Sequence, residues 1–202
     1  RQFNARHGII LMIYETIVTT CSPEGEVHIA PFGIQWHDGK VLIMPFKPST
    51  TLQNILQTGM AVLNLTDDVR VFAAAIAKKT TFATEVVAEG KALRLKDCLA
   101  HHVLTLAQVE EDEVRPKLWL NVLESETHAP FMGFNRAQAA VIELAVLVSR
   151  LQRLPVEKIT QEMQYLQIAI DKTAGPRELE AWQWLVDCVN NHLAQQSGLQ
   201  QA

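Results

Sequence analysis

The chain has 202 residues, of which 48% are apolar and 20% charged, and its formal net charge is -4. This balance is typical of an ordinary folded globular protein and excludes an intrinsically disordered chain. The pI is near 6.0, and the basic residues are scattered instead of forming the clustered basic face that nucleic-acid binding normally needs. We therefore expect no nucleic-acid partner.

The cysteine content also narrows the class of protein. Cys21, Cys98 and Cys188 are far apart and form no C-x-x-C motif, so no zinc site, no other metal site and no redox dithiol is predicted. An odd number of cysteines without a signal peptide predicts a cytoplasmic location. The apolar run at residues 8–14 lacks a small-residue cleavage site and is predicted to be a strand. No segment is long and apolar enough to predict a membrane span.

The first elements in the chain are three predicted strands. Residues 12–20 and 26–36 are separated by a Ser-Pro-Glu-Gly turn, and residues 40–46 follow the pair Asp38-Gly39. An Asp-Gly pair between two apolar runs is typical of a two-residue hairpin turn. The sequence therefore predicts a meander of antiparallel strands.

The predicted hairpin turn fixes which residues face each other. Pro31 is expected to face Phe46, and Phe32 is expected to face Pro45. Proline has no amide hydrogen, so two prolines here indicate an edge or an interrupted end of the sheet. Gly33 would allow another group to approach the backbone closely. A flat ligand is therefore expected to fit at this end of the hairpin.

The rest of the first two thirds mixes short helices with strands. We predict, in chain order, a helix at residues 51–59, a strand at 60–66, a short helix at 67–79 and an antiparallel pair of strands at 102–111 and 117–126. About six strands with short connections favour a small antiparallel barrel over a parallel α/β sheet.

The last third of the chain has only helical periodicity. From Asn135 onward apolar residues recur every three or four positions, and Gly175-Pro176 breaks the pattern into an αα-hairpin. Leu179 is expected on the apolar seam of that hairpin, whereas Trp184 falls off it and is expected on the barrel, on a second subunit or alone on the surface. The sequence predicts an α+β protein, with an antiparallel split barrel at residues 1–134 and a helical domain at residues 135–202.

A phosphate site is predicted where the third strand leads into the first helix. Lys47 supplies a cation, and Ser49, Thr50 and Thr51 supply three consecutive hydroxyl groups before a helix N-terminus. Free backbone N–H groups and the positive end of the helix dipole favour an anion there. The alternative is ordinary N-capping, which stabilises a helix by about 1 kcal/mol without any ligand.

A second candidate anion contact opens the helical part. Arg136 follows Asn135 in the first turn of a helix, where the helix dipole disfavours a cation unless an anion is near. The alternative is an exposed arginine that pairs with Glu143 or with a carboxylate from the barrel and contributes little. Both interpretations stay open from the sequence alone.

The chain lacks the motifs of several common enzyme classes. It contains no H-E-x-x-H, G-x-x-x-x-G-K-[ST] or G-x-G-x-x-G motif and no triad-like order of Ser, His and Asp. These absences count against zinc protease, P-loop, dinucleotide-fold and hydrolase classes. His101 and His102 are neighbours on a predicted strand and would point to opposite faces, so they are not expected to chelate a metal together.

Five runs of residues in this order resemble an uncharacterised family of the FMN-binding split-barrel superfamily, which also contains pyridoxamine-phosphate-oxidase-like proteins and flavin reductases. The runs are Tyr14-Glu15-Thr16-Ile17-Val18-Thr19-Thr20, Ala30-Pro31-Phe32-Gly33, Lys47-Pro48-Ser49-Thr50-Thr51-Leu52-Gln53-Asn54, Asn64-Leu65-Thr66-Asp67-Asp68 and Phe134-Asn135-Arg136-Ala137. The resemblance covers nearly the whole chain, including the helical tail.

The resemblance implies FMN as the cofactor and a homodimer in which two subunits share each site. It places the isoalloxazine ring against the backbone of Ala30, Pro31, Phe32 and Gly33. It places the phosphate around Lys47, Ser49, Thr50, Thr51 and the nearby Asn54, with Asn135 and Arg136 reaching the phosphate or the ring from the helical part.

The expected function is that of a flavin-dependent oxidoreductase of unknown substrate and electron donor. The family's association with methanogens and with bacteria of one-carbon metabolism suggests a link to one-carbon or pterin-cofactor metabolism. Two alternatives stay open: a non-catalytic flavin-binding or cofactor-handling protein, and a module that binds a phosphorylated ligand but no flavin. A shared fold does not fix a reaction.

Overall fold

The computed structural model describes residues 12–199. Residues 8–11 of the predicted first strand and residues 200–202 of the chain lie outside this range. The strands are β1 (Ile13–Cys21), β2 (Val27–His37), β3 (Lys40–Ile43), β4 (Met60–Leu65), β5 (Thr84–Val87), β6 (Ala92–Leu95), β7 (Ala100–Glu110) and β8 (Lys117–Thr127). The helices are α1 (Thr50–Thr58), α2 (Arg70–Ala77), α3 (Arg136–Val148), α4 (Val156–Thr173) and α5 (Pro176–Leu199), with short 3-10 turns η1 (Ala88–Gly90) and η2 (Leu151–Arg153).

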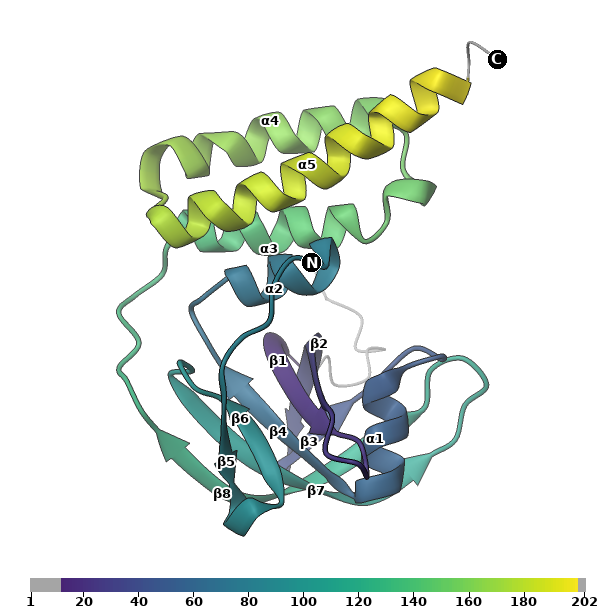
Figure 1. Ribbon diagram of the computed structural model, residues 1–202, viewed down its shortest axis with the longest axis vertical. Helices are drawn as coiled ribbons and strands as arrows, with labels where there is room; N and C mark the ends of the chain where they lie inside the picture. The colour runs from purple at the N-terminus through teal and green to yellow at the C-terminus, as the bar shows by residue number, and fades with distance from the viewer. Residues whose placement is uncertain (1–11, 200–202) are drawn as a thin grey trace, which may run out of the picture. The chain divides into compact units, whose positions relative to one another are not determined.

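Six strands close an antiparallel barrel in the order β1-β2-β3-β8-β7-β4, as Figure 1 shows. Its core consists of aliphatic side chains that are fully buried, among them Ile17, Ile34, Val41, Ile43, Leu63, Leu104, Leu118 and Leu120. Helix α1 packs on the barrel against β1 and β2. The predicted α+β class with an antiparallel barrel and a C-terminal helical region is confirmed.

The predicted hairpin register is confirmed for the residues that form the ladder between β2 and β3. His37 pairs with Lys40, and Gln35 pairs with Leu42. The predicted third strand is nevertheless too long, because β3 ends at Ile43.

The reason that β3 ends early lies in the bonds of the next residues. Pro45 has no amide hydrogen to donate to a ladder. The Lys47 amide donates to the Val114 carbonyl at 2.8 Å, and Arg115 Nε donates to the Met44 carbonyl at 3.0 Å. The segment therefore leaves β2 for the turn between β7 and β8, and the expected pairs of Pro31 and Phe32 with residues 45 and 46 are not part of the ladder.

Strands β5 and β6 form a separate two-stranded sheet that the sequence analysis did not assign. Each has only four residues, which is too short for a period-two pattern to stand out. Ala92 of β6 packs with Val62 of β4 and Val103 of β7 in a small buried cluster.

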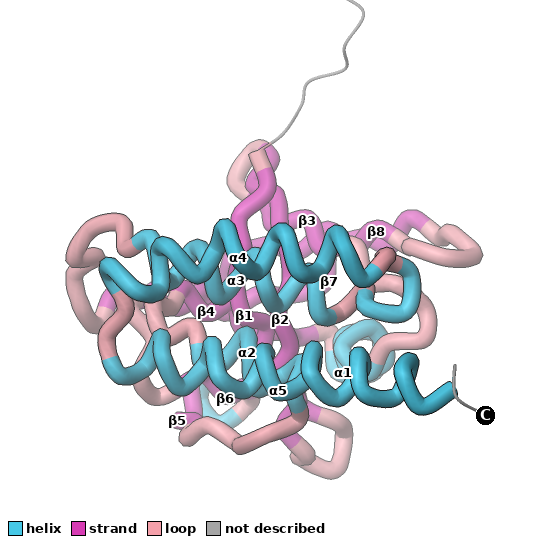
Figure 2. Tube along the Cα trace, turned by 90° about the horizontal axis from the view of Figure 1, so that it is seen from above, coloured by secondary structure: helices cyan, strands magenta, loops and turns pink. Residues whose placement is uncertain are grey.

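The helices other than α1 share a second core. Helix α3 packs against α4 and α5, and α2 packs against α3 and α5; Figure 2 shows the long helices of this group in cyan. The buried residues come from all four helices and include Ala73, Val141, Leu144, Ile159, Ile170, Trp182, Leu185 and Val189.

One expectation for the helical hairpin was wrong, and one of the three alternatives for Trp184 is excluded. Leu179 is 51% exposed and is not on the buried seam, which passes through Ala181, Trp182 and Leu185 instead. Trp184 packs partly buried against the helical core and is therefore not alone on the surface, while its expected contact with the barrel or with a second subunit stays a prediction. The partial burial of Trp184 arises because four helices, not two, share this core, and the added neighbours widen the buried stripe beyond a two-helix seam.

Contacts divide the chain into two compact units made of discontinuous segments. The barrel unit contains residues up to Asn64, Val86–Arg94 and His101–Glu126, and the helical unit contains Leu65–Glu85, Leu95–Ala100 and the residues from Thr127 onward. The sequence analysis had placed a single division after residue 134. No helix within residues 12–199 combines the length and the apolar character needed to cross a membrane.

Candidate functional site

The segment Ala30-Pro31-Phe32-Gly33 lies in β2, where it pairs with β1 alone. Pro31 faces Ile17 and Gly33 faces Glu15, whereas the pairing of β2 with β3 starts only at Gln35. All four residues are half-buried. One side of this stretch of backbone is therefore not used by the β2–β3 ladder, which leaves its polar groups available to another partner.

The side chain of Ile13 leaves no room for a residue larger than glycine at position 33. A Cβ atom at position 33 would lie 2.9 Å from Cγ2 of Ile13 on β1. Real Cβ contacts are essentially never this short, so a larger residue would force Ile13 to move. The close approach expected at Gly33 is made here by Ile13.

Ser49 is the N-cap of α1. Its backbone is extended, and its side chain accepts a hydrogen bond from the Leu52 amide at 3.2 Å. Ser49 also accepts from the Gln53 amide through its carbonyl oxygen. The amides of Thr50 and Thr51 precede the first intrahelical bond, so they remain as N–H donors at the helix start.

Thr51 carries the most informative side chain of this segment. It is only 1% exposed, and its Oγ1 is the single buried side-chain polar atom without a hydrogen-bond partner in the part of the chain that the structure describes. Leaving a buried hydroxyl without a partner costs roughly 1–3 kcal/mol. A phosphate at this helix N-terminus would supply the missing acceptor, so the donors present fit such a group.

Asn54 lies one turn further along α1 and is buried. Its Nδ2 donates to Oγ1 of Thr20 on β1 at 3.0 Å, which fixes the helix to the barrel. Sequence reasoning did not single out Thr20, because only the tertiary structure brings it next to α1. Asn54 therefore positions the helix through a contact within the protein.

Lys47 is exposed and is held by the turn between β7 and β8. Its Nζ donates to the Asp112 carbonyl at 2.9 Å and lies 3.6 Å from the Glu111 carboxylate. Hydrogen bonds from the Arg115 and Val114 amides lower the pKa of the Asp112 carboxyl, with a smaller contribution from the charge of Lys47. The turn thus stays anionic and attracts Lys47 electrostatically.

Asn135 and Arg136 lie in the helical unit at the start of α3. Asn135 Oδ1 accepts from the Ala137 and Gln138 amides, and its Nδ2 donates to the Thr173 carbonyl at 3.0 Å. These bonds use the carbonyl oxygen and one of the two N–H groups of the side-chain amide. Arg136 is exposed and makes no ion pair with Glu143.

The structure thus brings together most of the predicted residues in one unit. Ala30–Gly33 and the segment from Lys47 to Asn54 belong to the barrel unit, where α1 contacts both β1 and β2. Asn135 and Arg136 belong to the helical unit. The candidate site can therefore be described from the barrel residues alone.

The fold and this arrangement define a split-barrel protein with an additional helical unit. The chain belongs to the DUF447 family of proteins of unknown function: residues 14–129 match the N-terminal domain of that family, and residues 135–187 match its second part. No curated protein matches the chain.

Two solved structures share the fold, and a third matches with a lower TM-score. The FMN-bound protein of the DUF447 family from Methanosarcina mazei is 22% identical, with a TM-score of 0.75 over 90% of this chain and 97% of that one. A protein with a split barrel domain from Shewanella frigidimarina is 11% identical, with a TM-score of 0.51 over 57% of this chain and 67% of that one. Flavoredoxin from Methanosarcina acetivorans is 13% identical, and the match spans 63% of this chain and 75% of the flavoredoxin chain, with a TM-score of 0.49.

Proposed function

We propose that the protein binds FMN in its barrel unit and works as a flavin-dependent oxidoreductase. The observation that carries the proposal is the buried Thr51 hydroxyl, which has no partner at the N-terminus of α1. It is supported by the fold shared over 90% of the chain with an FMN-bound protein of the same family.

The phosphate would be held at the start of α1. The amides of Thr50 and Thr51 and the Thr51 hydroxyl would donate to its oxygens, and the helix dipole would favour its charge. The Ser49 hydroxyl already accepts from Leu52 but retains its own hydrogen to donate. Lys47 would add a positive charge from a distance, since its ammonium group is bonded to the β7–β8 turn.

The ring would lie against the backbone of Ala30 to Gly33, where the side of β2 next to β3 is free of the ladder. Bound FMN would supply the capacity to accept and release electrons, while the chain binds it, orients it and sets its local polarity. Contacts from Asn135 and Arg136, a site shared by two subunits and a link to one-carbon metabolism stay predictions from the resemblance.

The phosphate contact can be tested by comparing FMN with riboflavin. Thr51→Val keeps the shape of the side chain and removes the hydroxyl, so it should weaken FMN binding by about tenfold and leave riboflavin binding unchanged. Thr58→Val makes the same substitution at the other end of α1 and is the matched control. Isothermal titration of flavin-free protein measures both affinities.

Two outcomes would contradict the phosphate site. The first is an FMN affinity that does not change in Thr51→Val. The second is an equal loss in Thr51→Val and Thr58→Val, because a general weakening of α1 would then explain the effect.

The oxidoreductase activity needs a separate measurement. Anaerobic bleaching of the bound flavin by NADH or NADPH should be faster than the bleaching of free FMN at the same concentration. Bound flavin that is reduced no faster than free FMN by either nucleotide would contradict a nicotinamide-dependent reductase and favour the non-catalytic flavin-binding protein. Protein that binds neither FMN nor riboflavin would overturn the flavin proposal as a whole.

A further inference from the structure

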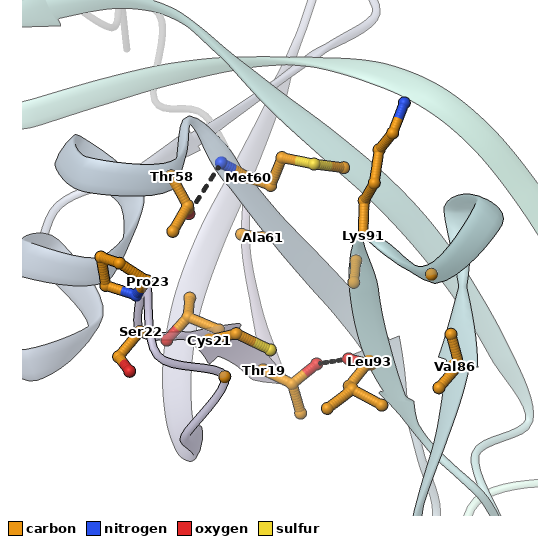
Figure 3. A pocket seen from close by; sticks show the side chains of 14 residues that line it. Thr19, Cys21, Ser22, Pro23, Thr58, Met60, Ala61, Val86, Lys91 and Leu93 are labelled. Carbon is orange, nitrogen blue, oxygen red and sulfur yellow. Dashed lines mark hydrogen bonds between the residues drawn. The ribbon is translucent and has the colours of Figure 1, made fainter.

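A cavity in the barrel unit is lined by none of the residues predicted to bind the cofactor, although Thr20 and Thr58 of its lining are hydrogen-bonded to Asn54. It has a volume of about 570 Å³ and is bordered by the end of β1, the β1–β2 turn, the end of α1, the start of β4 and the β5–β6 segment (Figure 3). This volume is within the range of about 300–1,000 Å³ that is usual for small-molecule sites. The cavity can therefore hold a ligand of its own.

Hydrogen bonds fix two of the cavity walls. Thr19 Oγ1 donates to the Leu93 carbonyl, which ties β1 to β6 across the floor. Thr58 Oγ1 donates to the Asn54 carbonyl and accepts from the Met60 amide, which fixes the junction of α1 and β4. The walls are thus formed before any ligand binds, which lowers the entropic cost of binding.

The cavity combines an apolar wall with one positive charge. Met60, Val86 and Leu93 line it, and Val86 is 64% exposed although it is aliphatic. Lys91 is the one charged residue of the lining, and no described ion pair involves it. Figure 3 shows Lys91, Leu93 and Val86 on one side of the cavity and Ser22 and Pro23 on the other.

Because the lining contains no acidic group, we expect a ligand with a negative charge. The whole chain carries 22 acidic and 18 basic residues, yet no carboxylate belongs to the lining. Glu24, Glu26 and Glu89 are close in the chain but are exposed and outside the lining. An unpaired ammonium group beside an apolar wall favours a ligand with a negative head and an apolar body.

We propose that this cavity is a second ligand site, distinct from the flavin site, that binds a small organic carboxylate. The carboxylate would pair with Lys91, and the apolar body would cover Met60, Val86 and Leu93. The proposal does not depend on flavin binding, since no residue of the lining is among those assigned to FMN.

Cys21 provides a direct way to observe occupancy. It lines the cavity and is partly exposed, whereas Cys98 is buried and Cys188 lies in the helical unit. Burial raises the pKa of the Cys21 thiol, so alkylation is best followed at alkaline pH. The variant Cys188→Ser leaves Cys21 as the only cysteine that is not buried.

The experiment measures the rate at which iodoacetamide alkylates Cys21, by mass spectrometry, in Cys188→Ser protein as purified. The probes are benzoate, 2-naphthoate and octanoate, each compared with its neutral amide. At a concentration ten times its Kd, a carboxylate that fills the cavity should slow the alkylation by about tenfold. The matching amides should bind more weakly by about tenfold, because they lack the charge that pairs with Lys91.

Two substitutions test whether the preference for carboxylates comes from the charge of Lys91 or from the loss of any surface lysine. Lys91→Met should abolish the preference for the carboxylates and leave the alkylation rate without ligand unchanged. Lys96→Met is the matched control, because Lys96 is outside the lining and lies 4.0 Å from Glu85. Lack of protection by all three carboxylates, equal protection by the amides, or a preference that survives in Lys91→Met would overturn the proposal.

Discussion

Two helix N-termini in this protein look alike in sequence and differ in structure. Helix α1 begins after Ser49 and helix α3 begins after Asn135, and both cap side chains accept hydrogen bonds from amides in the first turn of their helix. At α3 the cap side chain also donates to the Thr173 carbonyl, which ties the start of α3 to the end of α4. At α1 the Thr51 hydroxyl remains without a partner. The bonds of Asn135 indicate a structural role for the start of α3, and the unpaired Thr51 hydroxyl indicates a place for a ligand at the start of α1.

The largest effect on stability is expected at Asn135, the N-cap of α3. Asn135→Ala removes two capping bonds and the bond to the Thr173 carbonyl, and it should lower the free energy of unfolding by about 2 kcal/mol. Flavin titration of the same variant tests the predicted contact of Asn135 with FMN, since the bonds within the protein use only one of the two side-chain N–H groups. Urea unfolding and flavin titration measure the two quantities. A loss of FMN affinity with unchanged stability would instead make Asn135 a flavin contact.

A somewhat smaller effect is expected at Gly33. Gly33→Ala adds a methyl group 2.9 Å from Ile13 Cγ2, and such overpacking should cost about 1–2 kcal/mol. The double variant with Ile13→Ala should recover most of that loss, since the clashing atom is removed and Ile13 is 57% exposed. Thermal unfolding of the parent protein, both single variants and the double variant measures these stabilities as a double-mutant cycle. No recovery in the double variant would mean that Gly33 is needed for a reason other than Ile13.

The cap of α1 should contribute less to stability than that of α3. Ser49→Ala removes one bond to the Leu52 amide and should cost about 1 kcal/mol. It should also weaken FMN binding more than riboflavin binding, because the hydroxyl is next to the proposed phosphate. A loss of stability with equal changes in FMN and riboflavin affinity would assign Ser49 to capping alone. The start of α1 would then have the same structural role as the start of α3.

The smallest effect is a pH dependence confined to the barrel unit. Burial lowers the pKa of His28 and of His102, so each imidazole takes up a proton less readily in the folded than in the unfolded chain. Their contribution to stability is present above the unfolded pKa of about 6.5 and is lost as the pH falls through the lower folded value. The double variant His28→Gln/His102→Gln should show a smaller drop in melting temperature between about pH 7.5 and pH 5.5 than the parent protein. An equal drop in both would contradict this assignment.

Local signals predicted much of the barrel. The Asp38-Gly39 turn determined the register of β2 and β3, and the predicted ends of most strands differ from the observed ones by one or two residues. The errors occur where tertiary contacts compete with local ones. β3 ends at Ile43 because the following residues bond to the β7–β8 turn, which is more than sixty residues away in the chain.

The sequence by itself determined the strand and helix types, the hairpin register and a hydroxyl-rich helix start, because each depends on residues close together in the chain. Only the tertiary structure decided that α2 shares a core with α3 and α5, that Ile13 occupies the space beside Gly33 and that Lys47 is bonded to a distant turn. It alone showed that the Asn135 side chain bonds to Thr173 and to two amides of α3, while the buried Thr51 hydroxyl has no partner. Whether a polar atom finds a partner depends on which segments meet after folding, and no local pattern encodes that.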